Sequence, residues 1–159
     1  MDTFADASEK AYAAVVYLRN KIDEKYQVDL IFSKNRLCPT KGITILRPKL
    51  LALLIGIRAT AFGRELRLSF KRRIVGCDSK CVIHWLKTTK VLSTFVSNRI
   101  KEIKDAKGVE IYYVQSNENT ADIATRGCTS LELVNKRNWW AAPNWLSMSE
   151  NQWPQNLED

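Results

Sequence analysis

The sequence predicts an α/β fold in which a mixed five-stranded sheet, three antiparallel strands and then two parallel ones, carries helices on its faces. Two observations lead to this class. Early segments rich in β-branched and aromatic residues follow one another through short connections, which is typical of an antiparallel meander. Later strand-like segments alternate with segments of helical periodicity, which is typical of parallel strands joined by crossover helices.

Three strands are expected in the N-terminal part, at residues 2–7, 11–18 and 28–33. A loop at 38–42 follows them, because Pro39 and Gly42 both favour turns. The later elements are expected in the order helix 49–62, strand 74–77, helix 80–86, helix 91–104, strand 109–114 and helix 120–126. The helix at 49–62 is apolar nearly all round, so it should be buried against the sheet. Gly127 is suited to a left-handed cap after the last helix.

The C-terminal part has a different composition and is predicted to form an extension. Residues 138–159 contain four of the five tryptophans and no lysine or arginine. We therefore divide the chain into a domain at 1–137 and a Trp-rich extension at 138–159. Within it, residues 138–146 should pack back on the domain, and 147–159 should form a loose tail.

Composition indicates an intracellular protein, cytoplasmic or nuclear, that does not enter a membrane. No apolar run approaches the roughly 18 residues of a membrane span. The N-terminus carries Asp2 and Asp6 where a signal peptide has basic residues. The four cysteines form no CxxC pair and only one histidine is present, which argues for free thiols and against a zinc site.

Positive charge is concentrated in the middle of the chain. Residues 36–107 hold 17 Lys and Arg against four acids, whereas the remainder holds 8 bases and 13 acids. Such asymmetry favours a polyanionic partner, because each phosphate contact releases condensed counterions. The alternative is a solvated basic face without a partner.

Three acids occupy positions that favour chemistry. Asp78 directly follows the predicted strand 74–77 and precedes a helix, which is where α/β sheets usually place functional groups. Asp6 lies near the end of the first strand, and Asp122 lies in the first turn of the last helix. Each has a structural alternative: Asp78 could cap a helix, Asp6 could belong to a turn, and Asp122 could interact with a helix dipole.

The sequence segments around these acids are more informative about the protein family than the positions of the acids alone. The relevant segments are Phe4-Ala5-Asp6-Ala7-Ser8, Leu50-Leu51-Ala52-Leu53-Leu54, Asp78-Ser79-Lys80 and Ala121-Asp122-Ile123-Ala124-Thr125-Arg126-Gly127. Together with the order of elements, they resemble the ribonuclease-H-like domain in the polyprotein of Bel/Pao-type LTR retrotransposons. The resemblance covers roughly residues 2–146. It implies a ribonuclease H fold and, as neighbours in a parent polyprotein, reverse transcriptase and integrase regions.

The resemblance also implies a catalytic site. In that family four carboxylates hold two divalent ions, normally Mg²⁺ with Mn²⁺ as a substitute, for cleavage of the RNA strand of an RNA/DNA hybrid. Three of these carboxylates fall on Asp6, Asp78 and Asp122, which are the expected catalytic and metal-binding residues. The fourth, a glutamate, falls on Lys49. An ammonium donates hydrogen bonds and accepts none, so we expect Lys49 to pair with Asp6 or Asp78 and to weaken or abolish hydrolysis.

Two functions from different classes follow. The first is a divalent-metal endoribonuclease acting on RNA/DNA hybrids, and the second is a non-catalytic remnant or domesticated fragment that still binds nucleic acid. An exonuclease or integrase on the same fold is a poorer match to the motifs. The expected phosphate contacts, common to both functions, are Arg72, Arg73, Lys80, Lys87 and Lys90.

Overall fold

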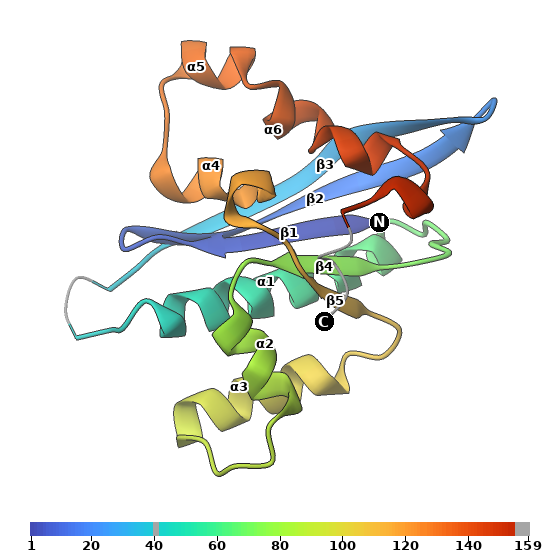
Figure 1. The fold of residues 1–159 in the computed structure, drawn as a ribbon. Helices are drawn as coiled ribbons and strands as arrows, with labels where there is room; N and C mark the ends of the chain where they lie inside the picture. The colour runs from blue at the N-terminus through green and yellow to red at the C-terminus, as the bar shows by residue number, and fades with distance from the viewer. Residues whose placement is uncertain (40–41, 155–159) are drawn as a thin grey trace.

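The computed structural model describes residues 1–39 and 42–154 and contains the mixed sheet that the sequence predicts (Figure 1). Its strand order is β3-β2-β1-β4-β5. The β1–β2 and β2–β3 pairs are antiparallel, and the β1–β4 and β4–β5 pairs are parallel. The expected loop at 38–42 lies partly outside the described residues.

The strands occur where the sequence predicts them, but two are longer. Their bounds are β1 Asp2–Ala7, β2 Ala11–Ile22, β3 Lys25–Leu37, β4 Ile74–Cys77 and β5 Glu110–Tyr113. β2 and β3 extend to a two-residue turn at Asp23 and Glu24, whose φ values are 47° and 66°. Turns of this hand match the twist of a hairpin. The extensions are largely polar and exposed, so no apolar alternation marks them in the sequence.

Three helices lie on one side of the sheet, below it in Figure 1: α1 Leu46–Glu65, α2 Lys80–Lys87 and α3 Thr94–Asp105. Leu50, Leu53, Val75 and Val82 form part of the core between α1, α2 and the strands. The apolar character of α1 is explained by this burial. α1 begins at Leu46, earlier than predicted, so Lys49 lies within its first turn.

The other side of the sheet is covered by the shorter helices α4 Ala121–Arg126 and α6 Arg137–Ala141, while α5 Ser130–Asn135 between them buries no residue. Phe4 and Tyr17 of the sheet pack here with Trp139 of α6 and with Leu146. α4 contacts both β1 and β2. Gly127 after α4 has a positive φ of 79°, but its ψ of 161° is not that of the predicted left-handed helical cap.

The C-terminal part is more ordered than predicted. Residues 147–154 are not a loose tail, because the short helix η3 at Glu150–Gln152 and Trp153 pack back on the domain. Arg19 of β2 donates hydrogen bonds to the carbonyls of Leu146 and Met148 at 2.7 and 2.6 Å. The prediction was wrong because it considered only local composition, whereas these contacts come from a strand far away in the sequence. Residues 155–159 lie outside the described part.

The predicted packing of residues 138–146 is confirmed, since Trp139 and Leu146 are buried in the core. The division between 137 and 138 stays a prediction. In the described ranges, no helix combines the length and apolar character needed to cross a lipid bilayer.

Gly76 of β4 is required by a close approach between the strand and the segment after β5. A Cβ at this position would lie 2.6 Å from Cγ2 of Val114, which is itself buried. We expect Gly76→Ala to lower the free energy of unfolding by about 1–3 kcal/mol, the usual cost of overpacking a core. Urea unfolding measures this loss.

The matched control is the double variant Gly76→Ala, Val114→Ala, which removes the side chain that would clash. Its loss should be smaller than the sum of the two single losses, because the clash is absent. Strict additivity of the two changes would contradict this account of Gly76.

Candidate functional site

Two of the predicted acids meet at one end of the sheet. Asp6 lies near the C-terminal end of β1, and Asp78 directly follows β4. β1 and β4 are parallel neighbours, with Ala5 paired to Cys77, so their C-terminal ends lie side by side. The strand pairing therefore brings together two carboxylates that are far apart in the sequence.

Lys49 lies between these two carboxylates. Its Nζ is 3.0 Å from Oδ1 of Asp6 and 2.6 Å from Oδ1 of Asp78, and it donates a hydrogen bond to each. The side chains of Asp6, Asp78 and Lys49 are 4%, 7% and 19% exposed. Charge-assisted hydrogen bonds shielded from water in this way are stronger than surface ion pairs.

The position of Lys49 in α1 would be unfavourable without this pairing. The first turn of α1 contains no acidic residue, and a cation near the positive end of a helix dipole is repelled. The carboxylates of Asp6 and Asp78 offset that repulsion. The pairing that the sequence predicts for Lys49 is thus present, and it involves both acids at once.

The outer oxygens of the two carboxylates are also bound. Oδ2 of Asp78 accepts a hydrogen bond from Oγ of Ser116 at 2.9 Å. Oδ2 of Asp6 lies 3.4 Å from Oγ1 of Thr125, a long hydrogen bond. Asp78 is therefore bound by Lys49 on one side and by the Ser116 hydroxyl on the other. Asp6 is bound by Lys49 and is approached by the Thr125 hydroxyl, whose single proton is shared with the closer carbonyl of Asp122.

Asp122 is close to this pair but is not joined to it by a direct bond. Its carboxylate pairs with Arg126 one turn later on α4, with Oδ1 2.6 Å from Nε. Its carbonyl accepts a hydrogen bond from Thr125 Oγ1, the same hydroxyl that approaches Asp6. In residues 1–39 and 42–154, no three His, Cys, Asp or Glu side chains are grouped so that they could hold a metal ion.

The sequence did not predict that Asn119 and Ser8 hold α4 against β1. The buried Asn119 donates from Nδ2 to the carbonyl of Ala5 at 2.9 Å and accepts from the backbone N–H of Ala121 at 3.2 Å. Ser8 donates from Oγ to the carbonyl of Thr125 at 2.8 Å. Asn119 and Thr125 flank Asp122 in the sequence, which is the signal that could have indicated them.

Burial dominates the electrostatics of Asp6. Loss of water and, to a smaller extent, the charge of Asp78 raise the pKa of Asp6, and Lys49 opposes both, so that the resulting pKa is about 6. For Lys49, burial acts to lower its pKa, but the hydrogen bond and charge of Asp78 and those of Asp6 outweigh it, so the pKa is raised. Lys49 is therefore a stable ammonium at neutral pH.

This donor set does not fit a divalent ion between Asp6 and Asp78. Mg²⁺ requires oxygen ligands close to octahedral geometry, and it cannot share two carboxylate oxygens with an ammonium that already binds both. The ammonium supplies positive charge at the point where an ion would act. Lys49, Asp6 and Asp78 therefore form an ion-pair cluster in which the ammonium occupies one oxygen of each carboxylate.

The expected phosphate contacts have different surroundings. Lys80, Lys87 and Lys90 are exposed, and Lys80 Nζ lies 4.9 Å from the ring centre of Tyr113. Arg73 is half-buried and donates to the carbonyl of Lys107. Arg72 is the least available, because three of its nitrogens donate to groups of the chain itself.

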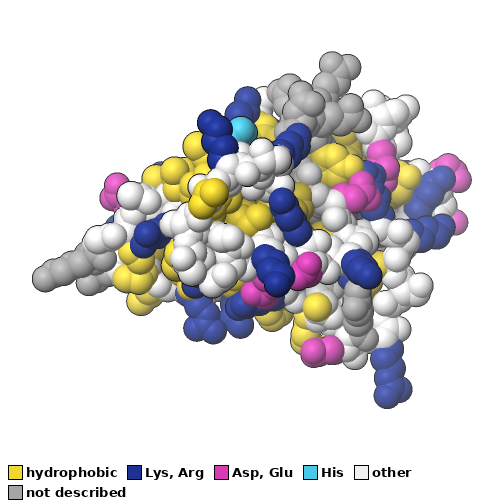
Figure 2. Space-filling view, turned by 90° about the horizontal axis from the view of Figure 1, so that it is seen from below, with side chains coloured by type: hydrophobic (Ala, Val, Ile, Leu, Met, Phe, Trp, Pro, Cys, Tyr) yellow, Lys and Arg dark blue, Asp and Glu magenta, His cyan; other side chains and the backbone are white. Residues whose placement is uncertain are grey.

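Figure 2 shows the underside of the molecule as oriented in Figure 1, the side that carries α1, α2 and α3. Lysine and arginine side chains are scattered over it among hydrophobic and a few acidic ones. This face therefore has the positive charge that the composition predicts, distributed over a broad surface.

Residues 1–79 match the family model described as "Pao retrotransposon-like RNaseH-like domain". The chain is similar to the solved N-terminal RNase H domain of rv2228c from Mycobacterium tuberculosis, with a TM-score of 0.55 and 16% identity over 79% of this chain and 92% of that one. For RNase H1 from the archaeon Halobacterium salinarum the TM-score is 0.47, with 12% identity over 74% and 86%. No curated protein matches. The predicted ribonuclease-H-like fold is confirmed.

The raised pKa of Asp6 predicts a pH-dependent stability. A carboxyl whose pKa is higher in the folded than in the unfolded protein binds its proton more tightly when folded. Its contribution is therefore full below the unfolded value of 3.8 and is lost as the pH rises through about 6. Relative to Asp6→Asn, the free energy of unfolding should fall by about 2 kcal/mol between about pH 4 and pH 7.

Urea unfolding of both chains across this range is the measurement, and a constant difference would contradict the assignment. In Lys49→Met the loss of the nearby cation should move the titration of Asp6 to still higher pH, visible by carboxyl ¹³C NMR. Lys101→Met, which removes an exposed lysine of α3, should leave that titration unchanged.

Proposed function

We propose that this chain, whose residues 1–79 belong to the Pao retrotransposon-like RNaseH-like domain family, binds nucleic-acid duplexes but cleaves them weakly or not at all. RNA/DNA hybrids are the expected duplex, and the reverse transcriptase and integrase regions of a parent polyprotein are the expected neighbours. The function is that of a ribonuclease-H-like domain with an impaired catalytic centre.

The position of the Lys49 ammonium carries the proposal. It lies 3.0 Å from Asp6 and 2.6 Å from Asp78, between the acids that would hold a divalent ion in an active site of this family. Relative to a glutamate, it removes one negative ligand and adds one positive charge. Loss of a single electrostatic stabiliser commonly lowers the rate by about 10²–10³-fold, and loss of an ion removes more.

Duplex binding is supported by charge. The excess of bases in residues 36–107 includes the exposed Lys80 and Lys87 of α2 and Lys90 just after it. α2 begins two residues after Asp78, so Lys80 lies at the same end of the sheet as the acids, and Lys87 ends the same helix. A duplex that met the acid pair would therefore meet this basic helix as well.

A second candidate is an active hydrolase that uses Mg²⁺ or Mn²⁺. The observation in its favour is that Asp6 and Asp78 are retained side by side, with Asp122 on the adjacent α4. For this function, a divalent ion would have to displace the Lys49 ammonium from both carboxylates. The energy of two buried charge-assisted hydrogen bonds opposes that exchange.

Lys49→Glu separates the two candidates. The variant restores a fourth carboxylate, so we expect cleavage of a labelled RNA/DNA hybrid in Mg²⁺ or Mn²⁺ to increase by about 10²-fold or more over the wild-type chain. Divalent ions should also raise the melting temperature of Lys49→Glu and not that of the wild-type chain.

Two variants control this experiment. Lys49→Met removes the ammonium without adding a ligand and should remain inactive. Lys49→Glu combined with Asp78→Asn should lose the gained activity. Robust and equal cleavage by the wild-type chain and by Lys49→Glu would refute the impaired site and favour the active hydrolase.

Binding is tested separately from cleavage. The affinity for a hybrid should fall steeply as salt increases. Lys80→Gln with Lys87→Gln should weaken binding and reduce the slope of log K against log salt by about one for each of these lysines that binds a phosphate. Lys136→Gln, which removes an exposed lysine between α5 and α6, is the matched control. An affinity that does not change with salt would exclude the basic face as the contact surface.

A further inference from the structure

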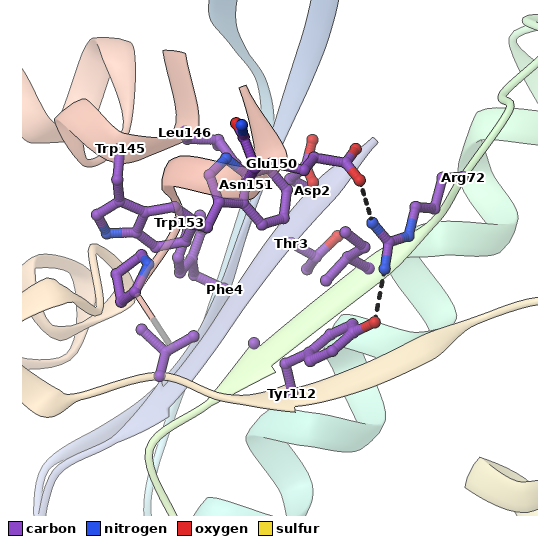
Figure 3. A pocket seen from close by; sticks show the side chains of 14 residues that line it. Asp2, Thr3, Phe4, Arg72, Tyr112, Trp145, Leu146, Glu150, Asn151 and Trp153 are labelled. Carbon is purple, nitrogen blue, oxygen red and sulfur yellow. Dashed lines mark hydrogen bonds and ion pairs between the residues drawn. The ribbon is translucent and has the colours of Figure 1, made fainter. Parts of the chain in front are cut away.

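A pocket of about 660 Å³ lies at the other end of the sheet from the acid pair (Figure 3). It is formed where β1 and β4 begin, between these strands, β5 and the C-terminal segment 144–154. Nothing in the ribonuclease-H-like function uses this pocket. Its aromatic side chains are Phe4, Tyr112, Trp145 and Trp153, and its charged side chains are Asp2, Arg72 and Glu150.

The aromatic side chains form one wall. Trp145 meets Phe4 and Trp153 edge to face, with ring centres 6.0 and 5.4 Å apart. In Figure 3 these three side chains gather on one side of the pocket, and Arg72 with Glu150 and Tyr112 lies on the other. Aromatic faces beside carboxylates are the usual setting for a guanidinium, which stacks on a ring and donates to an acid.

One arginine of the chain, Arg19, is already held between Tyr26 of β3 and the C-terminal segment. Arg19 lies with Cζ 3.6 Å from the ring centre of Tyr26 and 5.0 Å from that of Trp153. It also donates to the carbonyls of Leu146 and Met148. The segment is therefore chemically suited to guanidinium groups.

Arg72 is held at the far side of the same segment. It donates to both oxygens of Glu110, to Glu150 and to the hydroxyl of Tyr112, at 2.6–2.7 Å. Its charge is thus matched by two carboxylates. The charges of Arg72 and Glu150 compensate each other. Neither side chain is therefore expected to attract or repel a ligand strongly.

Asp2 differs from the other charged groups of the pocket. It is only 6% exposed, and within the described part of the chain its carboxylate has no hydrogen-bond partner. The carboxylate forms a buried ion pair with the amino group of Met1 at 3.8 Å. This distance is too long for a hydrogen bond, and the amino group donates to the carbonyl of Arg72 instead. A buried acid without a donor favours a ligand that brings one.

We propose that this pocket binds an arginine side chain presented by a partner polypeptide. The guanidinium would donate to the carboxylate of Asp2, and its flat face would lie against the aromatic wall of Trp145 and Trp153. Phosphate-bearing ligands are disfavoured, because the carboxylate of Asp2, which accepts no hydrogen bond from the described residues, would repel them. The site is separate from the acid pair and does not depend on whether the chain cleaves hybrids.

The test uses the full chain and the probe peptide acetyl-Gly-Arg-Gly-amide. Titration should shift the indole N–H signals of Trp145 and Trp153 in ¹H–¹⁵N spectra. The same peptide with citrulline in place of arginine keeps the shape and loses the charge, so it should bind about tenfold more weakly. Asp2→Asn should weaken arginine binding by a similar factor.

Asp105→Asn is the matched control, because it removes one exposed carboxylate from the end of α3 on the other side of the sheet. It should bind the arginine peptide as the wild-type chain does. Equal binding of the citrulline peptide, unchanged binding by Asp2→Asn, or no indole shifts at all would overturn the proposal. Indole shifts with uridine monophosphate and not with the arginine peptide would also overturn it and would assign the pocket to a nucleotide.

Discussion

The ammonium of Lys49 between the carboxylates of Asp6 and Asp78 is the interaction on which the functional end of this protein depends. The parallel pairing of β1 with β4 places two buried acids side by side, and two such charges cannot remain ionised without a counter-charge. The chain supplies this counter-charge itself, from the first turn of α1.

The acidic side chains at the two ends of the sheet are paired in different ways. At the C-terminal ends of β1 and β4, Lys49 donates to both carboxylates, and α4 is fixed to β1 through Asn119 and Ser8. At the N-terminal ends, the C-terminal segment is held by two arginines, and one buried acid, Asp2, has no donor within the described ranges. The acids at the first end share a donor, Lys49, whereas the carboxylate of Asp2 at the second end could still accept a hydrogen bond.

Much of the fold could be predicted from local signals. The strand 74–77 and the apolar helix α1 are each indicated by composition and flanking turns, and their order is enough to predict the mixed sheet. Two features could not be predicted in this way. The polar extensions of β2 and β3 have no apolar alternation. Residues 147–154 are held in place by Arg19 and Arg72, which are distant in the sequence.

The sequence by itself determined which residues are the candidates for chemistry: two acids at strand ends, a third at a helix start, and Lys49 at the start of the apolar helix. Only the tertiary structure decided how they are connected. It joins Lys49 to both Asp6 and Asp78, and it turns the carboxylate of Asp122 toward Arg126. The physical reason is that residue type fixes charge and hydrogen-bonding capacity, whereas the choice of partner depends on distances of a few ångströms that only strand register and helix packing set.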